Sequence, residues 1–561
     1  MVDQPLDGGR MPESHHVSDA SRPWKIAGLF VILSALGIGA ILFLRESPQN
    51  GNAQTITLPD DKKDEKPPSP LFRNWDKPTL AIAFTGQMYG YLQPCGCSYP
   101  QYGGLSRRFN FLKSLRDKGW PLVATDLGDL APRGGPQALL KYETAMSALG
   151  LMKYSGVGVG KNEFYLPLEE ALVVPLNNKL APRILAANLK EDDLVLPWKI
   201  VKEDNVTIGL TGVIGPGIIE EGKTKFPKVK FNPNAGKQVL SDLGSHKPDI
   251  VMMLYQGSED EAKECADICA KLRKTNPQIP KVDAILCLEK EEEPSGIAKK
   301  QGDTLILGIG HKGRYVGVLG AFRNKDNGPF ELKYQLVSIG PEWDTPKGKE
   351  KDNPVMVLME EYAKKVKERN YLTKYPRSKH PVQLGFENAK YIGSEACGNC
   401  HAHAYKIWED KGNPNPKALA HSRAFKSLEE AKYPSLRQFD GECVSCHVVG
   451  FQHNTGYADP ANNERINLKL LNVGCESCHG PGSDHANNPN DPKIKALINP
   501  FKAKPGEGAA AKQLRFNQMD HFCQKCHDID NDVNWGKVPF NVQWQKIAHP
   551  TPKQVQVGGG K

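Results

Sequence analysis

Between residue 78 and about residue 340, short apolar runs alternate with segments whose apolar side chains recur at helical spacing. The apolar runs have the length and composition of buried strands; they are Leu80–Phe84, Leu122–Thr125, Ile184–Ala186, Thr207–Leu210 and Ile250–Leu254. The segments between them predict amphipathic helices at Leu105–Leu115, Leu139–Leu149 and Asp260–Leu272. The end of this region predicts strands only, at Thr304–Leu307, Tyr315–Gly320 and Phe330–Ser338. Alternation of this kind predicts an α/β layered domain over residues 78–340.

Near the N-terminus, residues 26–44 form a run of 19 residues without a charge, IAGLFVILSALGIGAILFL. A helix of that length is about 28 Å long, just enough for the hydrocarbon layer of a membrane. Arg10, Arg22 and Lys25 precede it, which favours a cytoplasmic N-terminus. We therefore expect a cytoplasmic tail at 1–25 and an uncleaved transmembrane anchor at 26–44, with the rest exported. A cleaved signal peptide is the alternative, but the run is long for one.

Polar stretches mark the remaining boundaries. Residues 45–77 are rich in Lys, Asp and Pro and predict a solvated linker. Residues 341–390 predict a connector that contains one amphipathic helix, Pro354–Arg369. Residues 391–550 contain few long apolar runs, so we expect a mainly α-helical and irregular domain whose folding depends on a cofactor, followed by a flexible tail at 551–561.

The pattern C-x-x-C-H occurs four times in residues 391–550. The copies begin at Cys397, Cys443, Cys475 and Cys523. Two thiols at this spacing can reach the two vinyl groups of one haem, and the adjacent His can then bind the iron. This assigns haem attachment to Cys397, Cys400, Cys443, Cys446, Cys475, Cys478, Cys523 and Cys526, and proximal iron ligation to His401, His447, His479 and His527. Zinc sites do not require a His after each Cys pair, and a thioredoxin-like site needs only one pair.

The net charge and the remaining cysteines exclude further classes of partner and structure. The formal net charge of +9 is modest for 561 residues and forms no basic block, which argues against nucleic acid as a partner. Of the 13 cysteines, five lie outside the motifs: Cys95, Cys97, Cys265, Cys269 and Cys287. An odd remainder excludes a complete disulfide framework. The roles left open are a disulfide or redox pair, a thiolate ligand pair, and buried thiols.

The C-terminal region resembles a known family. The blocks YIGSEACGNCHAHAYKIW, GECVSCHVVGF, GCESCHGPGSDH, HFCQKCH and WQKIAHP are similar, in the same order, to the four-haem cytochrome c family that accepts electrons from hydroxylamine oxidoreductase. The resemblance implies four covalently bound haem c groups and three distal iron ligands, His421, His485 and His549. It leaves the second haem without a matched distal ligand, for which His453 is the candidate. His403 and His521 are weaker candidates, and Met519 is the only Met of the region.

Residues 79–340 resemble calcineurin-like metallophosphoesterases of the exported 5′-nucleotidase type. The blocks FTGQMYGYLQPCGCSYPQYGGLSRR, TDLGDL, YSGVGVGKNEF and TLILGIGHKGRYVGVL carry this resemblance. The metal-binding positions of that family fall on Gln87, Tyr89, the pair Lys161-Asn162 and Gln256, and the last of them lies near Cys287–Lys290, so only the bridging carboxylate, Asp129, is kept. A two-metal site needs several carboxylate and imidazole ligands. We therefore expect a degenerate metal site and a scaffold or docking role rather than phosphoesterase activity.

Together these features predict a membrane-anchored tetrahaem cytochrome on the periplasmic side of the bacterial cytoplasmic membrane. Its expected role is to relay electrons between redox partner proteins, or from a quinol-oxidising complex, without a catalytic side chain. The alternative is a multihaem oxidoreductase that acts on a small nitrogen compound at a five-coordinate haem. Arg423, Glu442, Asp484 and Arg515 are the acid–base candidates for that alternative.

Overall fold

The computed structural model describes residues 71–549, apart from 95–98, 191–193, 233, 324–327, 410–420 and 459–463. Residues from Pro70 onward form one compact unit. The predicted cytoplasmic tail, the C-terminal tail and most of the linker lie outside the described residues, as do Cys95 and Cys97.

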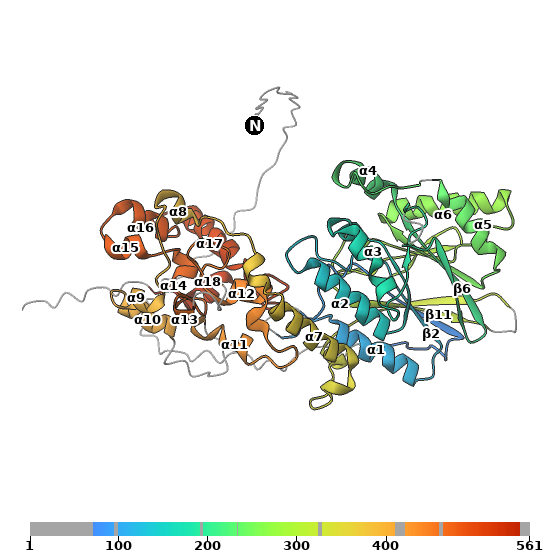
Figure 1. Ribbon diagram of the computed structural model, residues 1–561, viewed down its shortest axis with the longest axis horizontal. Coiled ribbons are helices and arrows are strands. Elements are labelled where there is room, and N and C mark those ends of the chain that lie inside the picture. The colour runs from blue at the N-terminus through green and yellow to red at the C-terminus, as the bar shows by residue number, and fades with distance from the viewer. Residues whose placement is uncertain are drawn as a thin grey trace, which may run out of the picture. The chain divides into compact units, whose positions relative to one another are not determined.

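The expected fold class is corrected on one point, the transmembrane helix. Among the described residues, no helix is both long enough and apolar enough to cross a membrane. The segment for which that helix was predicted, 26–44, lies outside the described residues. The observed fold is therefore an α/β domain followed by a mainly helical region (Figure 1).

The α/β domain contains two six-stranded sheets. The first has the strand order β12-β11-β1-β2-β3-β4, in which β1 to β4 run parallel and β11 and β12 are antiparallel to their neighbours. Its strands are β1 (Leu80–Thr85), β2 (Leu122–Asp126), β3 (Tyr154–Gly158), β4 (Ile184–Leu185), β11 (Tyr315–Phe322) and β12 (Glu331–Ser338).

The second sheet has the order β5-β6-β7-β8-β10-β9, with parallel pairing from β6 to β10 and antiparallel strands at both edges. Its strands are β5 (Trp198–Glu203), β6 (Val206–Ile214), β7 (Ile250–Gln256), β8 (Ala284–Cys287), β9 (Lys299–Gln301) and β10 (Thr304–Leu307). Strands β1 and β7 are buried along their whole length, as parallel strands covered on both faces must be.

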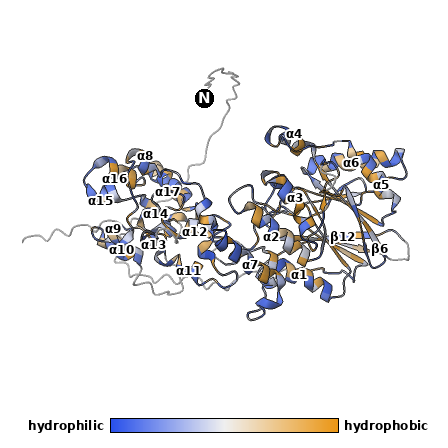
Figure 2. Ribbon diagram, viewed as in Figure 1, coloured by the Kyte–Doolittle hydropathy of each residue, from blue (hydrophilic) through white to orange (hydrophobic). Residues whose placement is uncertain are grey.

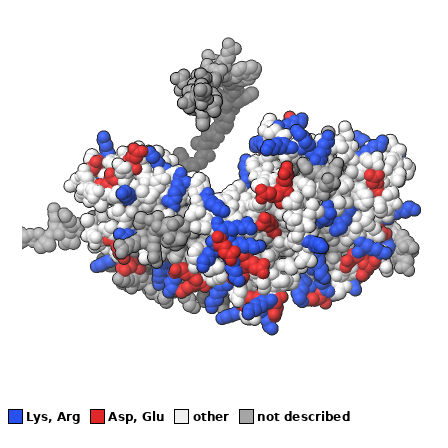
Figure 3. Space-filling model, viewed as in Figure 1, with Lys and Arg blue, Asp and Glu red and all other residues white. Residues whose placement is uncertain are grey.

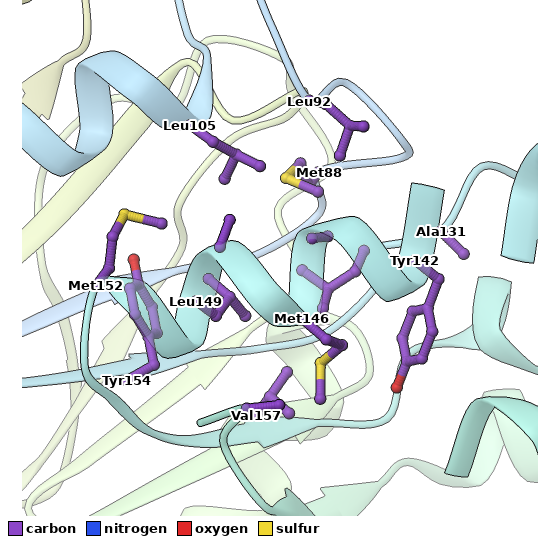
Figure 4. Packing of buried hydrophobic residues seen from close by; sticks show 14 of the residues in the cluster. Met88, Leu92, Leu105, Ala131, Tyr142, Met146, Leu149, Met152, Tyr154 and Val157 are labelled. Atoms are coloured by element: carbon purple, nitrogen blue, oxygen red, sulfur yellow. The ribbon is translucent and has the colours of Figure 1, made fainter. Parts of the chain in front are cut away.

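Apolar side chains of the two sheets pack against each other, and helices cover the outer faces. Leu80, Ile82, Leu210 and Leu254 belong to the cluster between the sheets. The first sheet is covered by α1 (Leu105–Asp117), α2 (Ala138–Leu151), α3 (Leu168–Asn177) and α7 (Pro354–Glu368), and the second by α5 (Ala235–Ser245) and α6 (Glu259–Thr275). Figure 4 shows Met146 and Leu149 of α2 in the apolar cluster that these contacts form. The remaining helix, α4, spans Pro216–Lys225.

The predicted helices and strands of the α/β domain are all present, with ends that differ by a few residues. The strands β3, β5, β8 and β9 were not predicted. The exposed or half-exposed side chains of β5 and β9 leave no apolar run to detect. The two-sheet architecture confirms the expected α/β layered domain.

The C-terminal region contains short helices joined by irregular segments. They are α8 (Pro381–Gly385), α9 (Ser394–Gly398), α10 (Ala402–Glu409), α11 (Lys426–Glu429), α12 (Gly441–His447), α13 (Glu464–Lys469), α14 (Cys475–His479), α15 (Ser483–Asn487), α16 (Pro492–Ile498), α17 (Ala509–Cys523) and α18 (Phe540–Gln545). Figure 2 shows α15, with the sequence SDHAN, as largely hydrophilic. The apolar clusters here are small, and the larger of them includes Val444, Val448, Phe451 and Tyr457. A region with so little apolar packing needs another source of buried surface.

Candidate functional site

Each C-x-x-C-H motif lies on one helical turn. The second and third motifs form α12 and α14, and the fourth begins at the last residue of α17. In the first motif the backbone N–H of His401 donates to the carbonyl of Cys397, at 2.9 Å. The same i to i−4 bond joins His527 to Cys523, at 3.0 Å. Such a turn brings the first Cys and the His to one side of the helix.

Three motif histidines each face a second imidazole from elsewhere in the chain. The ring centres of His401 and His485 lie 6.0 Å apart, as do those of His479 and His549. His421 and His527 are also 6.0 Å apart. Metal–imidazole bonds are about 2 Å long, so two rings that bind one metal from opposite sides have centres roughly 6 Å apart. The structure therefore brings together pairs of histidines at the spacing of a shared metal ion.

Three motif histidines, two of them members of these pairs, have a polar partner at Nδ1. His447 Nδ1 lies 2.6 Å from the carbonyl oxygen of Ala424, and His479 Nδ1 lies 2.7 Å from that of Ile498. His527 Nδ1 lies 3.1 Å from the carboxylate of Asp532. When Nδ1 carries the proton and donates it, Nε2 is left to bind a metal. The buried Nδ1 of His485 has no hydrogen-bond partner among the described residues.

Burial favours the neutral form of several of these imidazoles. It lowers the pKa of His421 to about 4, with a further contribution from His527. Burial also lowers the pKa values of His479 and His485. Neutral imidazole is the form that binds metal.

The thiols of different motifs lie close together. The thiols of Cys397 and Cys475 form a hydrogen bond, which lowers the pKa of Cys475 to about 7. The thiols of Cys446 and Cys526 form a hydrogen bond, which lowers the pKa of Cys446 to about 7. Cys478 of the third motif lies near enough to Cys523 of the fourth for the two to interact electrostatically; desolvation and this interaction both raise the pKa of Cys478. The motifs thus follow one another in space in the order first, third, fourth, second.

The remaining candidate ligands lie elsewhere. His453 packs edge-on against His380, with ring centres 5.1 Å apart, and its Nδ1 lies 3.4 Å from the Ser378 hydroxyl. The His403 side chain is exposed on α10, and that of His521 is exposed on α17. Met519 is buried, and its sulfur accepts a hydrogen bond from Arg515 at 3.8 Å. Within the described residues, the structure does not pair any of these four with a motif histidine through a ring contact.

Glu476, inside the third motif, is a residue that the sequence reasoning missed. Its side chain is buried, and its two oxygens accept hydrogen bonds from the backbone N–H groups of Ile392, Gly393 and Gly482 at 2.7–3.0 Å. It therefore fixes the segment before the first motif and the turn that leads to His485. A variable position of the motif gives no signal for such a role.

In the α/β domain, the positions that match phosphoesterase ligands bond to one another and to the backbone. The Gln87 amide donates to the Tyr89 hydroxyl at 2.8 Å and to the carbonyl of Glu289 at 3.0 Å. Asp129 accepts from the backbone N–H of Asn162 at 2.8 Å. No cluster of three or more metal-binding side chains occurs in the part of the chain that the structure describes.

Two neighbouring positions follow the same pattern. Lys161 pairs with Glu221 at 2.5 Å. The amide of Gln256 donates to the carbonyl of Leu127 at 2.6 Å.

The cysteines of this domain that the structure describes are buried or partly buried thiols. Cys265 and Cys269 lie on α6 as free thiols, and their side chains are joined by a hydrogen bond. Cys287 is buried at the end of β8, and its thiol donates to the carbonyl of Leu307 at 3.5 Å.

Acid–base groups near the motifs are engaged with other parts of the chain. Glu442 pairs with Lys141 of α2 at 2.5 Å, and Arg515 pairs with Glu507 at 2.7 Å. Asp484 accepts from the Ser483 hydroxyl at 2.9 Å. The Arg423 side chain is exposed.

Motif turns and paired imidazoles of this kind fit covalently bound haem c, with thiols for the vinyl groups and histidines for an iron that takes up and releases electrons. They define a multihaem c-type cytochrome region. A family described as cytochrome c554 and c-prime matches residues 396–480. Cytochrome c-554 of Nitrosomonas europaea is 30% identical over 166 residues, or 27% of this chain. The chain spans 65% of the length of that relative. The resemblance of the C-terminal region is thus confirmed, and it implies covalently bound haem c.

Two of the solved structures that are similar to the chain are a 5′-nucleotidase precursor and a calcineurin-like phosphoesterase. The 5′-nucleotidase precursor of Thermus thermophilus is 17% identical with a TM-score of 0.41, and the match covers 51% of this chain and 59% of that one. The calcineurin-like phosphoesterase YfkN of Bacillus subtilis is 18% identical with a TM-score of 0.39, covering 51% of this chain and 97% of that one. At these identities and TM-scores, the two matches carry no argument about the family or the function of this chain.

Proposed function

We propose that residues 391–550 bind four haem c groups and that the protein relays electrons between redox partner proteins. The observation that carries this proposal is the set of three histidine pairs, each with ring centres 6.0 Å apart and each containing one motif histidine. His485 would serve the first motif, His549 the third and His421 the fourth. These assignments use the three distal ligands that the family resemblance implies.

The order of the motifs supports a relay. Thiols of the first and third motifs, and of the second and fourth, are hydrogen-bonded, and Cys478 of the third motif interacts electrostatically with Cys523 of the fourth, so the cofactors would lie close together along the series first, third, fourth, second. A relay needs no acid–base side chain in a dry pocket. The oxidoreductase alternative does need one, and Glu442 and Arg515 are already paired with Lys141 and Glu507.

The α/β domain is proposed to be an inactive phosphoesterase-like scaffold for residues 391–550, which we call the haem region. Two motifs are tied to it. At the second motif, the Gln137 amide, next to the start of α2, donates to Asp440 at 2.9 Å, beside the Lys141–Glu442 ion pair. After the fourth motif, Asp530 pairs with Lys312 and Arg314 of the segment between β10 and β11.

The proposed location is the periplasm, where a soluble electron acceptor can reach the protein. Lys and Arg side chains are interspersed with Asp and Glu on the face shown in Figure 3. This mixture fits protein partners better than nucleic acid, which favours a continuous basic patch. Cell fractionation of the haem-stained protein tests this location, and haem-loaded protein in the cytoplasm would contradict it.

Mass spectrometry and spectroscopy of the full chain, made in a host competent in cytochrome maturation, test the main proposal. We expect four covalent haem additions and low-spin spectra for the haems held by paired histidines. Replacement of His485, His549 or His421 by Ala should convert one haem each to a high-spin form. Fewer additions, or variants that leave the spectrum unchanged, would contradict the proposal. A high-spin haem that turns over a small nitrogen compound would favour the oxidoreductase.

A further inference from the structure

The Nδ1 contacts of the motif histidines differ in kind. His447 and His479 each have a neutral backbone carbonyl as the partner of Nδ1. His527 instead has a carboxylate, because its Nδ1 lies 3.1 Å from Asp532 Oδ2. The side chain of Asp532 is mostly withdrawn from solvent, with 21% of its surface exposed. A charge in this position acts on the imidazole with less screening than one on the open surface.

The segment that carries Asp532 is held at both ends. The backbone N–H of Asp532 donates to the carbonyl of Asp528 at 2.7 Å, and the N–H of Trp535 donates to the carbonyl of Asp532 at 2.8 Å. The Trp535 indole stacks on the His527 ring, with centres 4.6 Å apart and planes 24° apart. His527 is therefore fixed by a carboxylate at its edge and an indole on its face.

The α/β domain braces the same segment. Asp530 accepts a hydrogen bond from the Tyr91 hydroxyl at 2.8 Å and pairs with Lys312 at 2.7 Å and with Arg314. Its side chain is 12% exposed, and those of the two cations are 14% and 15% exposed. These mostly buried contacts lie two residues before Asp532, so they restrict where its carboxylate can go.

We propose that Asp532 is a positioning residue that lowers the reduction potential of the fourth haem. The inference rests on the proposed function, since it requires haem at this motif. A carboxylate that accepts a hydrogen bond from Nδ1–H makes a ligated imidazole a stronger electron donor to the iron. Greater donation and a nearby negative charge favour ferric over ferrous iron. A carbonyl partner, as at His447 and His479, supplies no full charge.

The test is a spectroelectrochemical titration of the full-length, haem-loaded protein and its Asp532→Asn variant. The fourth haem is assigned as the one whose spectrum changes in His421→Ala. In Asp532→Asn we expect the ferrous-to-ferric ratio of that haem, at a fixed potential, to rise about tenfold, which is about +59 mV for a one-electron couple. Its electron paramagnetic resonance signal should shift as well, while the other haems keep their potentials.

Two further variants distinguish the effect of the Asp532–His527 hydrogen bond from that of any negative charge nearby. Asp520→Asn removes a carboxylate that accepts from the Trp535 indole at 2.8 Å, in the same neighbourhood but bonded to a different group. It should shift the potential less than Asp532→Asn does. Asp532→Glu keeps a carboxylate and should restore most of the wild-type potential.

Each outcome decides the matter. Equal shifts in Asp532→Asn and Asp520→Asn, or no shift with four haems attached, would overturn the inference and leave the proposed function intact. If the wild-type protein carries no haem at the fourth motif, the proposed function itself fails. If neither Asn nor Glu at position 532 gives protein loaded at that motif, Asp532 acts in folding, and the electronic role is rejected.

Discussion

His380, at the start of α8, shows how a single side chain responds to its surroundings. Its Nδ1 accepts a hydrogen bond from the backbone N–H of Val382 at 3.2 Å, which caps the helix. Burial lowers its pKa from 6.5 to about 4, and His453 and Lys525 contribute further. Because the accepting nitrogen must stay unprotonated, the cap and the neutral charge state depend on each other.

We expect His380 to make stability depend on pH. Its pKa is lower in the folded than in the unfolded protein, so between pH 6.5 and 4 the unfolded chain binds more protons. The free energy of unfolding therefore falls as the pH falls through this window. For this partly exposed group the loss is about 1–2 kcal/mol.

Denaturant titration at pH 7 and about pH 4.5 measures this loss. The variant His380→Asn, which keeps a capping acceptor without a titrating group, should lose less stability on acidification than the wild type. Equal losses in the two proteins would refute the prediction.

At the scale of elements, the short helices of the haem region are joined by specific polar contacts more than by apolar packing. Glu476 of α14 binds the backbone before α9 and the turn before α15. Ser394 of α9 in turn accepts a hydrogen bond from the backbone N–H of Cys475 at 3.1 Å. These bonds connect the elements that carry His401 and His485.

Replacement of Glu476 by Gln should destabilise this arrangement. A Gln side chain has one acceptor oxygen, and its amide group would face N–H donors, so buried donors lose their partners at about 2–3 kcal/mol. Glu395→Gln, an exposed change on α9, is the matched control and should be near neutral. Unfolding free energies and protease resistance of the haem region measure the difference. A Glu476→Gln protein as stable as the control would show that these bonds contribute little.

At the scale of the whole molecule, the haem region and the α/β domain belong to one compact unit because specific pairs join them. Asp530 contributes mostly buried ionic contacts with Lys312 and Arg314. Elsewhere in this unit, the Ser435 hydroxyl and N–H donate to Glu360 of α7, both at 2.7 Å. The α/β domain therefore does more than space the haem region from the N-terminus.

We expect Asp530→Ala to weaken the contact between the two regions. Removal of the carboxylate leaves Lys312 and Arg314 paired with the more exposed Glu292, which costs about 1–3 kcal/mol. Glu387→Ala breaks an exposed pair with Lys379 and should be close to neutral. Limited proteolysis of the connector at residues 341–390 reports the change. Unaltered cleavage in Asp530→Ala would contradict the scaffold role of this cluster.

The sequence determined the haem chemistry and most of the α/β domain. A C-x-x-C-H motif fits on one helical turn, so its thiols and imidazole converge without help from distant residues. Buried parallel strands are continuous apolar runs, which is why β1 and β7 were predictable. The family resemblance made His421, His485 and His549 candidate distal ligands, but nothing in their spacing says which motif each one faces.

Tertiary structure alone decided those pairings, the order of the motifs, and the roles of Glu476, Asp530 and Asp532. Each depends on contacts between residues distant in sequence or on the path of an irregular segment, and a local pattern does not encode either. The positions that resemble phosphoesterase ligands show the same division. Their departures from the family pattern were visible in the sequence, whereas the hydrogen bonds that Gln87 and Asp129 make required the folded chain. Local geometry places the thiols and the imidazole of each motif together, and long-range packing decides which distant side chains lie next to them.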